Sequence, residues 1–173
     1  MKINVGSGVL KLDGFINVDH LALPNVDVVH DLNSSPWPFA DESVEHIRAY
    51  NILEHLGNTI QVMEEIWRIL KPGGTVEICV PYYNSPCAFQ DPTHIKFFTE
   101  ETMDYFAVNG RHSHLNYYSK CRFEITQVVL SPIRSFLSFL PKRALRFLAH
   151  NFAIVYAVTF FLQKPPVKSE HEI

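Results

Sequence analysis

Two glycines and two acids stand where they could bind an adenosine. Gly6 and Gly8 follow a short apolar run, residues 2–5, and Asp19 and Asp31 come at the ends of the next two apolar runs. Because glycine has no side chain, a ligand can approach the backbone closely at such a turn. A carboxylate at Asp19 can accept both hydroxyls of a ribose, and one at Asp31 can accept from an adenine amino group. The pattern therefore indicates an adenosine site.

The glycine turn does not match two common nucleotide motifs. A dinucleotide-binding site has a third glycine, in the motif G-x-G-x-x-G, but this chain has Lys11 at the third position. The turn also lacks the Gly-Lys-Ser/Thr ending of a phosphate-binding loop. The sequence thus predicts an adenosine site with little provision for a pyrophosphate.

Alternating elements would position these residues in the first half of the chain. A helix is predicted over residues 59–70, because its apolar residues share one face, Asn58 can cap its start and Pro72 helps to end it. A second helix is predicted from Thr99 to about Phe106. The buried strands predicted in this half are residues 2–5, 15–19, 26–30, 46–50 and 75–81. Strands alternating with helices favour a parallel sheet covered on both faces.

Two longer strand-like runs, residues 122–130 and 151–163, would pair antiparallel at one edge of the sheet. The predicted fold is α/β: a doubly wound, Rossmann-like sheet of seven strands, mostly parallel, with one antiparallel C-terminal strand. Only nine residues, 6 to 14, link the first two strands, whereas a parallel crossover usually takes about a dozen or more. The helix expected there must shrink to about one turn, which would leave a ligand more exposed on that side.

The bulk composition bounds the classes of protein. A chain of 173 residues indicates one domain, residues 1–166, with substrate or lid segments at about 82–122 and 132–151 and a flexible tail at 167–173. A net charge of −3 disfavours nucleic-acid binding through the whole surface. The three cysteines fit no disulfide framework, and His112 with His114 has no evident third ligand, so no metal site is predicted. The longest apolar run, residues 152–162, is too short to span a bilayer. These features predict a cytoplasmic protein.

Five stretches in order resemble the class I S-adenosylmethionine-dependent methyltransferases, specifically the short type 11-like group. They are INVGSG, FINVD, the run from HDLNSS to LEHL, MEEIWRILKPGG and TVEICVP, and the resemblance covers roughly residues 2–106. It implies S-adenosyl-L-methionine as the cofactor and methyl transfer to a small molecule. Relatives of this type favour a sugar or lipid-linked glycan hydroxyl as the acceptor.

The resemblance also implies which residues contact the cofactor. The glycine turn would line its methionine part, Asp19 would hold the ribose, Asp31 and Leu32 would flank the adenine, and Asn51 with Ile52 would lie near the sulfonium. The turn usually opens with an acid where this chain has Asn4. The full set of expected cofactor residues is Asn4, Val5, Gly6, Ser7, Gly8, Asp19, His20, Asp31, Leu32, Asn51 and Ile52.

The segment after the fifth strand is where a doubly wound sheet places its substrate loop. His94 could act as a general base oriented by Asp91, although the same residues could form only a turn and a helix cap. Tyr82 and Tyr83 are expected substrate contacts, with a wall or core role as the alternative. His55 could face the ligand or cap the next helix.

The apolar segment 135–150 carries a basic stripe, Lys142, Arg143 and Arg146. It could be a lid over the site, an interfacial helix that makes peripheral membrane contact, or a connector that covers the sheet edge or a homodimer partner. Pro141 would interrupt such a helix. Two alternatives to the methyltransferase hypothesis stay open: a non-catalytic cofactor-binding or membrane/partner scaffold protein of the same fold, and a nicotinamide-dependent oxidoreductase.

Overall fold

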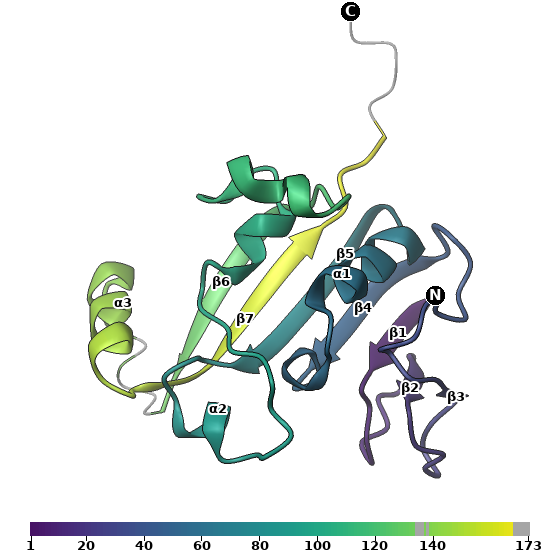
Figure 1. The fold of residues 1–173 in the computed structure, drawn as a ribbon, viewed down its shortest axis with the longest axis horizontal. Helices are drawn as coiled ribbons and strands as arrows, with labels where there is room; N and C mark the ends of the chain where they lie inside the picture. Colours follow the sequence, from purple (N-terminus) through teal and green to yellow (C-terminus); the bar gives the residue numbers. More distant parts are fainter. Residues whose placement is uncertain (134–136, 138, 168–173) are drawn as a thin grey trace, which may run out of the picture.

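The computed structural model describes residues 1–133, 137 and 139–167. Its centre is a seven-stranded sheet in the order β3-β2-β1-β4-β5-β7-β6 (Figure 1). The strands are β1 (Lys2–Val5), β2 (Ile16–Asp19), β3 (Val28–Val29), β4 (Val44–Tyr50), β5 (Leu70–Pro81), β6 (Glu124–Pro132) and β7 (Val155–Gln163). The predicted tail from residue 168 onward lies outside the described residues.

The strand directions confirm the predicted fold. All pairings from β3 to β5 are parallel, whereas β7 runs antiparallel to both of its neighbours, β5 and β6. From β1 the chain winds outward through β2 and β3, and it then returns to β4 and winds the other way to β5. The switch between β1 and β4 is where open α/β sheets bind their ligands, at the carboxyl ends of the strands.

One face of the sheet packs against α1 (Thr59–Ile69), which Figure 1 shows lying across β4 and β5. Val62, Met63, Ile66 and Ile69 of α1 are buried in the core. The side chain of Asn58 accepts a hydrogen bond from the Gln61 backbone N–H at 3.2 Å and caps the helix. The helix predicted over residues 59–70 and its cap are therefore confirmed.

The crossovers β1–β2 and β2–β3, residues 6–15 and 20–27, contain turns and no helix, and the structure describes all of these residues. The predicted shrinkage of the first crossover is confirmed. The sheet face opposite α1 is accordingly polar: the register aligns Asn4 with Arg48 and Arg48 with Glu77. Phe15 covers part of this face by packing edge-on against His46, with ring centroids 5.7 Å apart. Helices therefore do not cover both faces there as predicted, because the short link of residues 6–15 leaves no room for one.

The prediction of a second α-helix from Thr99 is wrong. After α2 (Pro86–Phe89) come two short 3-10 helices, η2 (Thr102–Phe106) and η3 (Ser113–Tyr118). The 3-10 helix η2 ends at Phe106, as predicted, but it begins three residues later than the predicted helix. Before it, Phe98 pairs with Tyr82 and its carbonyl accepts the Tyr83 N–H at 2.9 Å; after it, Phe123 N–H donates to Phe106 O at 3.0 Å.

The basic-apolar segment forms α3 (Lys142–Asn151), which begins directly after Pro141. Residues 134–136 and 138 of this segment lie outside the described residues. Glu100 anchors α3: its Oε1 lies 3.4 Å from Arg146 Nε and 3.2 Å from His150 Nε2, while Tyr82 OH donates to Oε2 at 2.7 Å. The helix thus packs on the segment after β5. Figure 1 shows it at the opposite end of the molecule from β3.

Among the residues that the structure describes, no helix is long and apolar enough to cross a membrane.

Candidate active site

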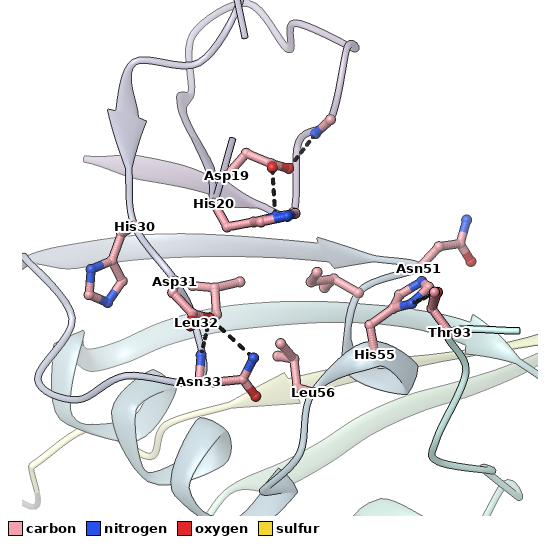
Figure 2. Close-up of a pocket in the computed structure, with 13 residues that line it drawn as sticks. Asp19, His20, His30, Asp31, Leu32, Asn33, Asn51, His55, Leu56 and Thr93 are labelled. Atoms are coloured by element: carbon pink, nitrogen blue, oxygen red, sulfur yellow. Dashed lines mark hydrogen bonds and ion pairs between the residues drawn. The ribbon is translucent and has the colours of Figure 1, made fainter. Parts of the chain in front are cut away.

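A cavity of about 580 Å³ lies at the carboxyl ends of β1, β2 and β4, at the topological switch of the sheet (Figure 2). Its walls come from the turns that follow the first four strands, from η1 (Leu53–His55) and from Thr93. The lining residues are Gly6, Gly8, Asp19, His20, His30, Asp31, Leu32, Asn33, Asn51, Ile52, His55, Leu56 and Thr93.

The glycine turn has left-handed backbone geometry at both glycines, with φ of +68° at Gly6 and +53° at Gly8. A Cβ added at Gly6 would lie 2.6 Å from Cβ of Ile52, so only glycine lets the turn after β1 approach the turn after β4. A Cβ added at Gly8 would meet nothing within 4 Å. The backbone at Gly8 therefore borders open space on the cavity side of the turn.

Asp19 fixes the glycine turn and keeps acceptor capacity. Its Oδ2 accepts the Gly8 N–H at 2.8 Å, its Oδ1 accepts the Leu21 N–H at 3.1 Å, and Oδ1 lies 3.1 Å from His20 Nδ1. A carboxylate offers about four acceptor positions. After these three contacts, Oδ2 still has a lone pair for a ligand hydroxyl. A second hydroxyl can bind Oδ1 when the exposed His20 ring turns away.

Asp31 lies across the cavity from Asp19 (Figure 2). Its Oδ1 accepts the Asn33 N–H at 2.9 Å and the Asn33 side-chain amide at 3.1 Å. The bond from the Asn33 backbone lowers the pKa of Asp31, so the carboxylate is ionised and its Oδ2 is available. Asn33 also accepts the Gly57 N–H at 2.8 Å, which ties the turn after β3 to the start of α1.

The turn after β4 forms another wall. Asn51 has a left-handed backbone, with φ of +50°, and its N–H donates to Cys79 O at 2.8 Å. Asparagine is one of the few residues besides glycine that adopt this conformation readily. The turn places Ile52 against Gly6 and exposes the Asn51 side chain to the cavity.

A hydrogen-bond chain reaches this end of the cavity from the segment after β5. Thr93 Oγ1 donates to Asp91 Oδ1 at 2.7 Å and contacts His55 Nδ1 at 2.9 Å. Figure 2 shows His55 and Thr93 near Asn51, away from Asp31 and His30. The backbone N–H groups of Ile95 and Lys96 donate to Glu54 O at 2.9 and 3.2 Å, which holds the two segments together.

Behind His55 lies a buried carboxylate. Glu54 is 1% exposed, and within the described part of the chain neither of its carboxylate oxygens has a hydrogen-bond partner. Burial raises the pKa of Glu54 to about 7. Burial likewise lowers the pKa of His55, and the neighbouring His94 lowers it further. The rings of His55 and His94 meet edge to face with centroids 4.7 Å apart.

The cavity brings together eight of the eleven expected cofactor residues, together with His55. Three expected residues do not line it: Asn4, Val5 and Ser7. The Asn4 amide instead donates to Asn17 Oδ1 at 3.1 Å on the polar sheet face. Ser7 Oγ is buried and has no hydrogen-bond partner among the described residues.

Four residues expected to act on the substrate also lie outside the lining: Asp91, His94, Tyr82 and Tyr83. His94 Nε2 is 4.0 Å from Asp91 Oδ2, so these two are neighbours, as the base hypothesis requires. The hydroxyl of Tyr82 donates its hydrogen bond to Glu100. None of the residues of α3 lines the cavity, so α3 does not form the predicted lid in this conformation.

Sequence reasoning missed four lining residues, namely His30, Asn33, Leu56 and Thr93. The Asp-Leu-Asn spacing after β3 is a local signal that could have indicated Asn33, because an aspartate often binds the backbone two residues on. The Asp-Pro-Thr spacing after β5 is the same signal for Thr93, whose N–H donates to Asp91 Oδ1 at 2.9 Å.

The chain is similar to proteins of known class. Residues 12–78 match the model of the "Methyltransferase domain" family. A protein of Mycolicibacterium smegmatis that carries the name "Probable S-adenosylmethionine-dependent methyltransferase" is 34% identical over 58 residues, which are 34% of this chain and 22% of that protein. The chain therefore spans about a fifth of the length of this curated relative.

Two solved structures extend the similarity to the whole fold. A SAM dependent methyltransferase from Archaeoglobus fulgidus aligns with a TM-score of 0.65 at 14% identity, over 94% of this chain and 85% of that one. The cyclase SpnF aligns with a TM-score of 0.62 at 16% identity, over 96% and 74%.

These similarities confirm the predicted fold. The chain has the fold of the class I S-adenosylmethionine-dependent methyltransferases. Its residues 12–78, from the β1–β2 turn to β5, carry the sequence signature of the methyltransferase domain family.

Proposed function

We propose that the protein binds S-adenosyl-L-methionine in the cavity and transfers its methyl group to a small molecule. The observation that carries the proposal is the placement of Asp19 and Asp31 on one cavity with the glycine turn and the Asn51 turn. Carboxylates at two neighbouring strand ends suit the hydroxyl and amino groups of an adenosine.

The residues present fit this cofactor. Asp19 would bind the ribose hydroxyls through its free lone pairs, and Asp31 Oδ2 would accept from the adenine amino group. Gly8 leaves room for the methionine part, and Ile52 supplies an apolar wall. The cofactor supplies a methyl carbon activated by a sulfonium. The chain's residues would hold the two reactants in line and exclude water.

The missing helix after β1 argues against a nicotinamide dinucleotide. Such sites place the pyrophosphate at the N-terminus of the helix that follows the first strand. Here residues 6–15 contain no helix, and all of them are described. Nothing in this crossover supplies the aligned N–H groups that a pyrophosphate needs.

Calorimetry with S-adenosylhomocysteine, NAD and ATP tests the cofactor. We expect only S-adenosylhomocysteine to bind. Asp31→Ala should weaken that binding without unfolding, because the Asp31 side chain is exposed and, among the residues described, its carboxylate bonds only to Asn33. Asp19→Ala should abolish it, and circular dichroism must show that the variant is folded, since Asp19 also bonds the glycine turn.

Asp13→Ala is the matched control. Asp13 is an exposed acid in the β1–β2 crossover, and it lies outside the cavity lining. Equal affinity of the Asp13 and Asp31 variants for S-adenosylhomocysteine would contradict the proposed site.

For the acceptor, we propose a sugar or lipid-linked glycan hydroxyl, as the family resemblance implies. A hydroxyl needs a general base, and His94 is the candidate, because its Nδ1 lies 3.2 Å from Ala88 O, which leaves Nε2 as the proton acceptor. His55 lines the cavity and would contact the acceptor. The base role is tested by turnover of His94→Asn: an unchanged rate rules it out.

A second candidate is a non-catalytic or differently acting protein of the same fold. The similarity to SpnF supports it, because a protein named a cyclase shares this architecture and fold alone does not fix the reaction. Binding of S-adenosylhomocysteine without transfer to any tested sugar or lipid acceptor would favour this candidate.

Partners and location belong to the same proposal. Phe139 and Phe147 are 90% and 65% exposed and flank Lys142 and Arg143, which supports peripheral membrane contact through the described part of segment 135–150. Homodimer contact through the same surface and a cytoplasmic location stay predictions.

A further inference from the structure

Glu54, His55 and His94 form a cluster whose three side chains each offer one ligand atom, all within 4.8 Å of one another. His94 Nε2 lies 3.9 Å from Glu54 Oε1. Two members, Glu54 and His55, are neighbours in η1, and the third, His94, comes from the segment after β5. Proposed methyl transfer assigns no role to Glu54.

Hydrogen bonding fixes the protonation of both imidazoles. Thr93 has one hydroxyl hydrogen, which it donates to Asp91, so its contact with His55 requires an N–H at Nδ1 of His55. His94 Nδ1 lies 3.2 Å from Ala88 O, and a carbonyl can only accept. In the neutral form each ring therefore has its lone pair on Nε2.

This is how proteins prepare histidines to bind metals. A ligating histidine almost always donates its other N–H to a carboxylate, a backbone carbonyl or a water, which fixes the ring and its tautomer. His94 uses the Ala88 carbonyl, and His55 uses Thr93, which in turn bonds Asp91.

The Glu54 carboxylate lacks the partners that a buried charge requires. The side chain is 2% exposed, both oxygens are without hydrogen bonds among the described residues, and the facing nitrogen on His94 presents a lone pair. A buried ionised carboxylate is retained when it is paired or coordinates a metal. A carboxylate and an imidazole lone pair that face each other are satisfied together by a cation, and a ligand atom of His55 lies within 4.8 Å of both groups.

We propose that Glu54, His55 and His94 bind a divalent transition-metal ion, with Zn²⁺ the best match. Two imidazoles and one carboxylate are the ligand set of catalytic zinc sites, which keep a fourth position open. A hard cation such as Mg²⁺ prefers an all-oxygen set, which this cluster does not offer. The open position would face the cavity, because His55 lines it.

This inference goes beyond the proposed methyl transfer, since the metal would bind whether or not a methyl group is transferred. One extension rests on that proposed function. A hydroxyl acceptor bound at the open position would have its pKa lowered by the metal. Metal binding would occupy the His94 lone pair, so the base and ligand roles of His94 exclude each other.

The test uses untagged, chelator-treated full-length protein. Zn²⁺ is titrated by calorimetry, and Co²⁺ is titrated by visible absorption, which reports the coordination geometry. We expect one ion per chain, a rise in melting temperature on adding Zn²⁺, and loss of at least about tenfold in affinity for Glu54→Gln, His55→Ala and His94→Ala. His114→Ala is the control, because His114 is exposed and outside the cluster, and it should bind normally.

Glu54→Gln also guards against a folding artefact. Removal of the buried charge should leave the metal-free variant at least as stable as the wild type at neutral pH, so lost binding cannot be ascribed to unfolding. Absence of Zn²⁺ and Co²⁺ binding up to about 1 mM, or equal affinity in the Glu54 and His94 variants and the wild type, overturns the metal site.

Failure of the metal site and failure of the proposed function can be told apart. Asp31→Ala should lose S-adenosylhomocysteine binding and keep the metal, whereas His94→Ala should do the reverse. Each ligand is measured separately on both variants.

Discussion

Gly6 is the residue at which the backbone geometry is most demanding. Its φ of +68° costs any other residue about 1–2 kcal/mol, and a Cβ would lie 2.6 Å from Ile52. We expect Gly6→Ala to lower the free energy of unfolding by that amount plus about 1–3 kcal/mol of overpacking, as measured by urea denaturation.

Gly14 supplies the control for this prediction. Its φ is +79°, but a Cβ there would meet nothing within 4 Å. Gly14→Ala should therefore show the backbone cost alone. Equal losses in the two variants would mean that Ile52 moves aside and that the close approach of the two turns is unimportant.

At the residue scale, the sequence was most informative where the chemistry is local. The glycines lie directly after a strand, and the acids end strands, so their positions follow from the strand pattern alone. Glu54 was missed for the opposite reason. Its significance depends on burial and on His94, 40 residues further along the chain, and neither can be read from the residues beside it.

The cap of α1 gives a prediction at the scale of the element. Asn58→Ala removes the acceptor for the Gln61 N–H and should cost about 1 kcal/mol of unfolding free energy in urea. A serine at this position, in Asn58→Ser, can accept the same hydrogen bond, so this variant should keep most of the unfolding free energy that Asn58→Ala loses. No difference between the two variants would show that the cap contributes nothing measurable.

Glu65 attaches α1 to the chain before β4 and makes the attachment sensitive to pH. Its carboxylate accepts the Trp37 N–H at 2.6 Å and bonds to the Arg68 guanidinium at 2.7 and 3.0 Å. Burial opposes ionisation, but the bonds from Arg68 and Trp37 outweigh it and hold the pKa of Glu65 below its usual value of 4.5.

Because the folded state lowers this pKa, the stabilisation is fully present above pH 4.5 and is lost as the pH falls through the lower folded value. Glu65→Gln should therefore have a lower free energy of unfolding than the wild type at neutral pH. The difference between the two proteins should become smaller as the pH falls. Urea denaturation from pH 7 to 3 measures it. Glu124→Gln, at an exposed site, should track the wild type throughout.

The elements also show where local patterns fail. Residues 59–69 formed the expected helix because an apolar face, a cap and a Pro-Gly-Gly stop all agree. Residues 99–106 have a capping threonine and acids too, but they form only a 3-10 helix over 102–106, bounded by long-range pairing of Phe98 with Tyr82 and of Phe106 with Phe123. That pairing joins residues that no local pattern connects.

At the scale of the whole molecule, the exposed face of α3 predicts binding to acidic vesicles. The wild type should float with anionic liposomes at low salt, and Lys142→Ala/Arg143→Ala should reduce this strongly. Arg146 is left unchanged because it contacts Glu100. Lys120→Ala, an exposed lysine outside α3, is the control. Wild type that stays at the bottom of the gradient contradicts the membrane hypothesis.

The doubly wound fold could be predicted because the number of strands and the final antiparallel pair follow from the pattern of strand-like and helical runs along the chain. The placement of α3 could not. Its contacts to Glu100 and Asn84 are made between segments about 50 to 65 residues apart, and the sequence alone left a lid, a membrane helix and a connector as alternatives.

The bare turn between β1 and β2 has a practical consequence. Because no helix covers that side of the cavity, one side of any bound ligand should remain in contact with bulk water. We therefore expect rapid exchange of bound nucleoside, and tolerance of a fluorophore or resin linker attached through the water-facing edge, which would make the protein easy to capture on an immobilised analogue.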